Sequence, residues 1–154
     1  MKLNQQSQQN LISIFPKIEL SYIKNIHKKV HSDMYLIIPK GYKYFAWFKC
    51  WNNQNLCIIL KVDTRSKTIS NISVYPCIFN HLLCAGKGTI LYGTIIFNKC
   101  NHFCIEDIFY YKNKNVNFLN FHQKLQYLEK MFYNDLSQNV YKKNDIVFSL
   151  PIMD

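Results

Sequence analysis

Two adjacent acidic residues, Glu106 and Asp107, lie inside an apolar run, and two lysines, Lys112 and Lys114, follow them closely. Carboxylates in such a setting can bind a metal ion or anchor a buried hydrogen-bond network, and lysines can bind phosphate. Buried polar groups are as a rule hydrogen-bonded. We therefore expect Asp107 to be a structural anchor that is held by a donor or a cation.

Two runs must position these residues, at 89–97 and 102–111, and both are rich in β-branched and aromatic residues. Because a short polar segment separates them, the pattern predicts a β-hairpin. Side chains alternate along a strand, so the second run is expected to place Glu106 and Ile108 on one face and Asp107 on the other.

The same stretch resembles the covalent nucleotidyltransferase superfamily, which contains the adenylation and guanylylation domains of DNA ligases, RNA ligases and mRNA capping enzymes. That family has a strand with LDGE, then a strand reading roughly FD, two apolar residues, Y-x-(N/K)-G-K, and then a helix. Leu91-Tyr92-Gly93-Thr94 stands at the first position, and DIFYYKNKNV at 107–116 matches the second, with Asn113 at the usual turn glycine. The resemblance spans about residues 34–150 and is close to catalytically inactive members such as the cap-binding domain of snurportin.

The departures from the family pattern bear on catalysis. Family members attack a nucleoside triphosphate with the lysine of K-x-D-G, which needs a lowered pKa and a metal ion that neutralises the phosphates. The nearest match is Lys49-Cys50-Trp51-Asn52, which lacks the Asp and the Gly, and Tyr92 and Thr94 replace the acids of LDGE. The resemblance therefore implies an inactive relative without a cofactor. Lys49 is either the remaining candidate for a catalytic lysine or an ordinary lysine at a strand end.

Aromatic and basic residues near these motifs are the candidates for binding RNA, DNA, a nucleotide or an mRNA cap. Aromatic rings stack on bases, and ammonium groups bind phosphate. The candidates are Trp47, Lys49, Trp51, Tyr92, Tyr110, Tyr111, Lys112 and Lys114.

Six cysteines and five histidines raise the question of zinc binding. The lesser metal candidates are Cys77, His81, Cys84, Cys100, His102 and Cys104. Neither C-x3-H-x2-C nor C-x-H-x-C is a standard zinc-knuckle spacing. We therefore expect reduced, buried or half-buried thiols and no metal ion.

The chain of 154 residues contains 19 basic and 9 acidic residues, which gives a formal net charge of +10. A basic surface attracts polyanions through counterion release. Arg65 is the single arginine, however, and arginine is the residue that binds phosphate or guanine with two parallel hydrogen bonds. The bias toward Asn, Lys, Ile, Tyr and Phe resembles AT-rich coding, as in large DNA viruses or parasites, so charge alone leaves nucleic-acid binding open.

Patterns along the chain predict one α+β domain of antiparallel sheets with a few packed helices, and the resemblance implies a truncated nucleotidyltransferase-like, ATP-grasp-like core. Residues 1–17 are expected to form a loosely ordered leader and residues 18–154 the domain. Strands are expected at 34–38, 44–49, 56–62, 68–75 and 146–150, helices at 19–30 and 118–136, and a helical turn within 78–84.

These observations favour an inactive nucleotidyltransferase-like module that binds RNA, DNA or a nucleotide or cap in a transcription or RNA-processing assembly of a large DNA virus. The alternative is a structural or accessory subunit of a virion or complex, because a truncated sheet leaves an edge for a protein partner or a second copy. An active ligase or guanylyltransferase is the third hypothesis. No apolar run reaches about 18 residues and no secretory signal is evident, so we expect an intracellular protein without membrane association, in the host cytoplasm or the virion if viral.

Overall fold

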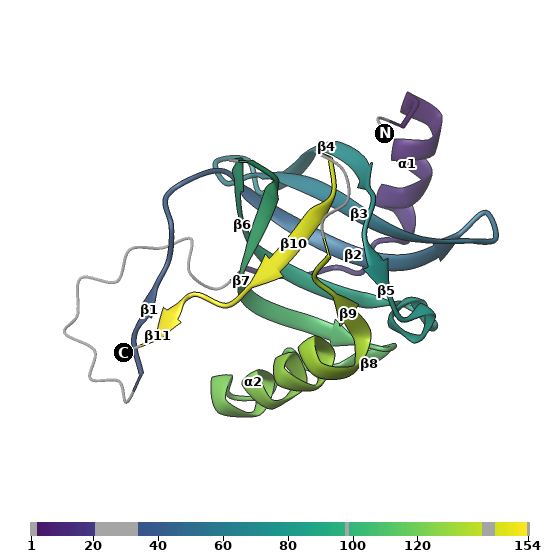
Figure 1. The fold of residues 1–154 in the computed structure, drawn as a ribbon. Coiled ribbons are helices and arrows are strands. Elements are labelled where there is room, and N and C mark those ends of the chain that lie inside the picture. Colours follow the sequence, from purple (N-terminus) through teal and green to yellow (C-terminus); the bar gives the residue numbers. More distant parts are fainter. Residues whose placement is uncertain (1–2, 21–33, 98, 140–143, 154) are drawn as a thin grey trace.

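A seven-stranded sheet is the centre of the computed structural model, which describes residues 3–20, 34–97, 99–139 and 144–153 (Figure 1). Six strands follow the order β10-β7-β6-β2-β3-β4, and β8 pairs with β7. Neighbouring strands are antiparallel, except that β10 runs parallel to β7. The strands are β2 (Lys43–Trp51), β3 (Gln54–Asp63), β4 (Thr68–Tyr75), β6 (Thr89–Phe97), β7 (Asn101–Tyr111), β8 (Lys114–Asn115) and β10 (Ile146–Ser149).

Shorter elements surround this sheet. Two small antiparallel ribbons pair β1 (Leu36–Ile37) with β11 (Ile152–Met153) and β5 (Ile78–Phe79) with β9 (Leu136–Ser137). The helical elements are α1 (Gln5–Ile14), the 3-10 turn η1 (His81–Cys84), α2 (Phe121–Lys130) and the π-helical turn η2 (Met131–Asp135). Helices α1 and α2 lie on opposite sides of the sheet in Figure 1.

The sheet is apolar on both faces, because its strands alternate between two sets of large side chains. In β2, Ala46 and Phe48 face a first core, and Phe45 and Trp47 face a second. Elements α2, η1 and β10 contribute buried residues to the first core, and α1 contributes the fully buried Leu11 to the second. The strand that carries Lys49 is therefore covered on both sides.

Strand β7 departs from regular alternation at Glu106. Asp107 and Ile105 pair with consecutive residues of β6, so Glu106 between them is the extra residue of a β-bulge. Ile105 and Ile108 consequently lie in the same core, and Glu106 and Asp107 line the same pocket. The expectation of strict alternation across Glu106, Asp107 and Ile108 is thus wrong, because the bulge shifts the register within the strand.

Helix α1 lies in the segment that the sequence predicts to be a loose leader. The Asn4 side chain caps it by accepting a hydrogen bond from the Ser7 N–H at 2.8 Å. Leu3 and Leu11 are buried in the second core. The described part of residues 1–17 is therefore packed on the domain, which differs from the prediction, because two leucines among the amides anchor the helix.

Helix α2 and the turn η2 lie in the span 118–136 that is predicted to be helical. Asn120 and Gln123 form a capping box, in which each side chain accepts a hydrogen bond from the other residue's N–H, at 2.9 and 3.2 Å. The chain then continues through η2 to Asp135. The helix prediction is confirmed, with its ends shortened by a few residues.

The remaining predicted elements are confirmed with small changes at their ends, for the strands of the main sheet and for the helical turn η1. Most of the helix predicted at 19–30 lies outside the described residues. The architecture is mixed α+β and mainly antiparallel. Within the ranges described, no helix is both long and apolar enough to cross a membrane.

Candidate nucleic-acid interface

Three segments meet at one end of the sheet. Lys49, near the end of β2, donates a hydrogen bond to the Gly86 carbonyl, and the Lys87 N–H donates to the Asn113 side chain at 2.8 Å. The Asn113 N–H donates in turn to the Gly88 carbonyl at 3.0 Å. These contacts bring Lys49 and Lys87 together with Lys114, which follows Asn113 in the chain. We call these three lysines the basic end.

Backbone conformation explains why these turns carry glycine and asparagine. Gly86 and Gly88 have φ angles of 56° and 85°, and Asn113 has a φ angle of 74°. Glycine and asparagine tolerate such left-handed values best. A Cβ atom at Gly88 would lie 2.1 Å from the carbonyl oxygen of Phe48, so glycine also permits the close approach of the turn to β2.

The lysines of the basic end carry positive charge that nearby acids do not balance. The segments 49–52, 85–88 and 110–115 contain no Asp or Glu. Lys87 and Lys114 are exposed, and none of the three lysines forms an ion pair with another described residue. Lys114 instead donates to the Tyr127 hydroxyl at 2.7 Å. Such ammonium groups attract phosphate and release its counterions.

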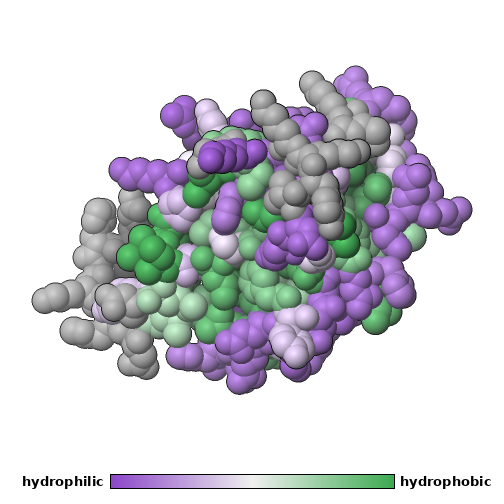
Figure 2. Space-filling model, viewed as in Figure 1, coloured by the Kyte–Doolittle hydropathy of each residue, from purple (hydrophilic) through white to green (hydrophobic). Residues whose placement is uncertain are grey.

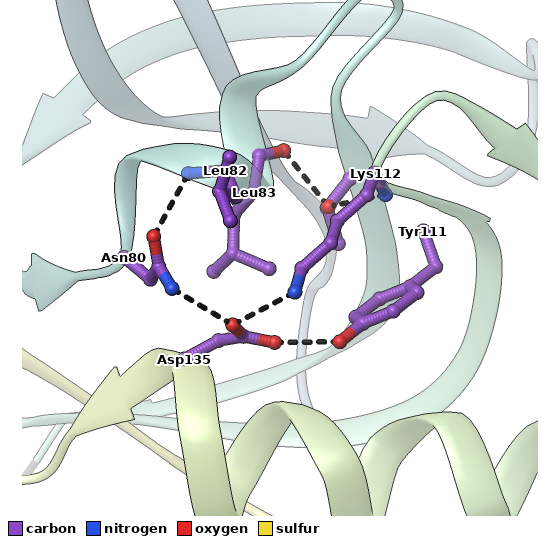
Figure 3. A network of polar contacts seen from close by, with 7 residues as sticks. Asn80, Leu82, Leu83, Tyr111, Lys112 and Asp135 are labelled. Atoms are coloured by element: carbon purple, nitrogen blue, oxygen red, sulfur yellow. Dashed lines mark hydrogen bonds and ion pairs between the residues drawn. The ribbon is translucent and has the colours of Figure 1, made fainter.

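Lys112, also predicted to bind phosphate, contacts a buried carboxylate instead (Figure 3). Its Nζ lies 3.0 Å from Asp135 Oδ1, to which Asn80 Nδ2 donates at 3.3 Å, and the Tyr111 hydroxyl donates to Oδ2 at 2.6 Å. The Asp135 side chain is fully buried, and Tyr111 is buried as well. Burial first, and then the hydrogen bond to Asp135, raises the pKa of Tyr111 well above its usual value. Lys112 and Tyr111 thus join β7 to η2, which is a structural role.

The remaining aromatic candidates fall into two groups. Trp51 and Tyr110 are half-buried, and Lys87 Nζ lies 5.9 Å from the centre of the Tyr110 ring. Trp47 and Tyr92 are only 0% and 3% exposed, so neither ring is available to stack on a base from solvent. The Trp47 indole N–H donates to the Lys87 carbonyl at 2.9 Å and thereby fixes the turn.

A second polar cluster surrounds Glu106. Lys43 Nζ lies 2.5 Å from Glu106 Oε1 and 2.7 Å from Thr94 Oγ1, and the Thr94 hydroxyl lies 3.3 Å from the same Glu106 oxygen. The Glu106 side chain is 3% exposed, and its Oε2 has no hydrogen-bond partner among the described residues. Burial, and then the charge of Glu106, raise the pKa of Tyr92 to about 12. An acid therefore lies beside Thr94, which stands where LDGE has its second acid, but Lys43 balances its charge.

A pocket of about 420 Å³ lies beside this cluster, a size that suits a small ring system. On one side Lys124 Nζ pairs with Asp107 Oδ1 at 2.7 Å, and the Ile108 N–H donates to the same oxygen at 2.8 Å. Asp107 therefore joins β7 to α2. The pocket is lined by Leu36, Ile38, Glu106, Asp107, Leu119, Phe121 and Lys124.

Several residues of these two sites are absent from the sequence-based candidates. Lys87 carries a usable signal, because glycines flank it on both sides and mark a tight turn. Lys43 has no such signal in the sequence, because its contact with Glu106 joins two residues that are 63 positions apart. The same holds for Asp135, whose partners Asn80, Tyr111 and Lys112 come from two segments that are far from it in the sequence.

The residues named as lesser metal candidates do not come together. Within the part of the chain that the structure describes, no three His, Cys, Asp or Glu side chains are close enough to hold a metal ion. His102 Nε2 lies 2.7 Å from Ser149 Oγ, His81 is exposed, and Cys84 and Cys104 are buried. The cysteines are free thiols.

Neither the protein-family models nor the curated proteins that were compared with this chain give a match. The resemblance to nucleotidyltransferases therefore rests on residues 91–94 and 107–116 and stays a prediction.

Proposed function

We propose that this chain is a catalytically inactive nucleotidyltransferase-like module that binds RNA, DNA or a nucleotide or cap, with the basic end as its contact to phosphate. The observation that carries the proposal is the convergence of Lys49, Lys87 and Lys114 from three segments without an acid among them. Of the aromatic residues that the sequence suggests as ligand contacts, Trp51 and Tyr110 lie at the same end and remain partly accessible. Lysine contacts of this kind give affinity for the backbone without selecting a base sequence.

Two contacts support the absence of covalent chemistry. A nucleophilic lysine needs a free amine and acids that hold a metal ion against the triphosphate. The Lys49 amine donates to the Gly86 carbonyl, and its surrounding segments contain no acid. Glu106, the acid beside Thr94, is already paired with Lys43. Incubation with labelled ATP or GTP and Mg²⁺ should leave the protein unlabelled; a covalent adduct that disappears in Lys49→Ala would contradict the proposal.

The pocket beside Glu106 supports a base or a free nucleotide as part of the ligand. Leu36, Ile38 and Phe121 give it apolar walls, as expected for a flat ring. Asp107 and Lys124 supply an acceptor and a donor at its edge. A free nucleotide or cap analogue would therefore bind here even when the basic end is neutralised.

Fluorescence anisotropy with a labelled single-stranded oligoribonucleotide at low ionic strength tests the proposal. The informative variant replaces Lys49, Lys87 and Lys114 with glutamine. Its control makes the same charge change at three exposed lysines elsewhere, Lys17, Lys67 and Lys99. We expect the first variant to lose affinity at least tenfold more than the control, because only its lysines are clustered. Equal losses would show that the net charge alone attracts the oligonucleotide.

The accessory-subunit alternative is favoured by a different observation. Tyr35, Ile37 and Ile152 are more than half exposed, and they lie on or beside the ribbon of β1 and β11. Figure 2 shows apolar side chains on this part of the molecule, which Figure 1 shows as an extension from the main sheet. Light scattering after size exclusion separates the two functions. Self-association that Ile37→Lys abolishes, together with no affinity for oligonucleotides, would favour the subunit.

A further inference from the structure

A tyrosine of helix α2 has two lysines close to its ring. Lys114 Nζ donates a hydrogen bond to the Tyr127 hydroxyl at 2.7 Å and lies 5.3 Å from the centre of the Tyr127 ring. Lys130 Nζ lies 5.4 Å from the centre of the same ring. We call Lys114, Tyr127 and Lys130 the α2 cluster. It adjoins the basic end, because Lys114 belongs to both.

Packing against the sheet holds the Tyr127 ring in place. The Tyr127 side chain is half-buried and packs against the first core. Its ring centre lies 5.3 Å from that of Tyr111, which is itself buried and donates a hydrogen bond to Asp135. The hydroxyl to which Lys114 donates therefore has a position that the core determines.

Acids do not balance the charge of the two lysines in the α2 cluster. Glu129 is the only acid between residues 112 and 134. Residues three apart on an α-helix share a face, so Lys130 lies on the same side of α2 as Tyr127, whereas Glu129 is turned about 160° away from Tyr127. Lys114 and Lys130 are exposed, and neither forms an ion pair with another described residue. The cluster therefore carries a local positive charge.

The Tyr127 hydroxyl adds a hydrogen-bond donor to these charges. A phenolic hydroxyl can accept and donate at the same time, and the Tyr127 oxygen accepts from Lys114. Its own proton has no acceptor among the described residues. Two ammonium groups and one hydroxyl thus offer donors without an acceptor between them. A phosphate group suits such a set, because its charged oxygens accept hydrogen bonds.

We infer that the α2 cluster binds a phosphate group of the nucleic-acid ligand, and that this ligand is a single-stranded polynucleotide and not a mononucleotide. The inference rests on the proposed function, which assigns phosphate contacts to the basic end. Lys130 extends the row of lysines without ion pairs from β8 onto α2, so that four segments of the chain contribute to it. A mononucleotide carries its phosphates in one group, whereas a polynucleotide presents one at every nucleotide. Lysines on separate segments therefore fit the spaced phosphates of a polynucleotide.

Fluorescence anisotropy with a labelled single-stranded oligouridylate, over a range of salt concentrations, tests the inference. Tyr127→Phe should lower the affinity about fivefold and keep the slope of log K against log salt concentration, because it removes a hydrogen bond but no cation. Its matched control is Tyr133→Phe, at a tyrosine that is 90% exposed, and should bind as wild type does. Lys130→Gln should reduce the slope by about 0.7, and its control Lys67→Gln should keep the slope. Unlabelled UTP should displace the labelled probe far less well than the unlabelled oligouridylate does at the same concentration.

A variant in which glutamine replaces Lys49 and Lys87 separates failure of the inference from failure of the proposed function. If this variant binds weakly but Tyr127→Phe keeps the wild-type affinity or Lys130→Gln keeps the wild-type slope, the inference is overturned and the proposed function stands. A lower melting temperature of Tyr127→Phe at unchanged affinity also overturns it, because Tyr127 then serves only to join α2 to β8. Displacement by UTP that equals displacement by the oligouridylate excludes a polynucleotide as the ligand. Absence of binding by wild type overturns both proposals.

Discussion

The buried carboxylate of Asp135 offers the sharpest prediction about stability. Asp135→Ala removes the acceptor of Tyr111, Lys112 and Asn80 at once. Removing one partner of a buried ion pair costs about 3–5 kcal/mol. Lys112 is 29% exposed and can return its charge to water, so we expect the lower limit, about 3 kcal/mol.

Chemical denaturation in urea measures this loss, and a double-mutant cycle assigns it. A loss of about 3 kcal/mol corresponds to a fall in Tm of about 6–12 °C for a chain of this length. Asp135→Asn keeps the shape and one acceptor but loses the charge, and should cost about 1–2 kcal/mol.

The cycle of Asp135→Asn with Tyr111→Phe should show a coupling of about 1 kcal/mol, because the two groups contact at 2.6 Å. A cost below about 1 kcal/mol for Asp135→Ala, or additive single variants, would refute the role of this network.

Three further predictions concern the same fold. The pKa of Tyr111 is raised in the folded state, so the stability that Tyr111 contributes is present below the unfolded pKa of about 10 and is lost as the pH rises through the folded value. In thermal melts above about pH 10, wild type should therefore lose its stability advantage over Tyr111→Phe. A difference in stability that stays constant with pH would contradict this. A Cβ at Gly93 would lie 2.0 Å from the Cys104 carbonyl oxygen, beside the bulge, so Gly93→Ala should cost more than about 2 kcal/mol in urea denaturation, and a neutral effect would disprove the register. Lys43→Met leaves the Glu106 carboxylate buried without its cation and should lower the free energy of unfolding by about 3 kcal/mol. Adding Glu106→Gln to the same chain should restore part of this loss. A double variant that is less stable than Lys43→Met would argue against the ion pair.

Periodicity and turn signals in the sequence predict most of the sheet. The run 68–75 and the run 89–97 agree with β4 and β6 to the residue, because β-branched and aromatic runs between turn residues are a strong local signal. The bulge at Glu106 has no such signal, since it depends on how β7 pairs with β6. One inserted residue was enough to move two acids to the same pocket.

The candidate site is predicted less well than the fold, for a related reason. Lys49, Lys114 and Tyr110 lie at or beside the basic end as the motif suggests, because they flank turns that sequence reveals. Trp47 is a candidate because of its aromatic ring, but alternation in β2 directs it into the second core. Exposure of an aromatic residue depends on which face α1 covers, and that is a long-range property.

The salt dependence of oligonucleotide binding tests the central claim most directly. Each phosphate contact contributes about 0.7 to the slope of log K against log salt concentration for a single strand, so losing three contacts should reduce the slope by about 2. The glutamine variant of Lys49, Lys87 and Lys114 should show this reduction, and the control variant of Lys17, Lys67 and Lys99 should keep the wild-type slope. Identical slopes in wild type and in the Lys49, Lys87 and Lys114 variant would contradict the basic end as the phosphate-binding surface.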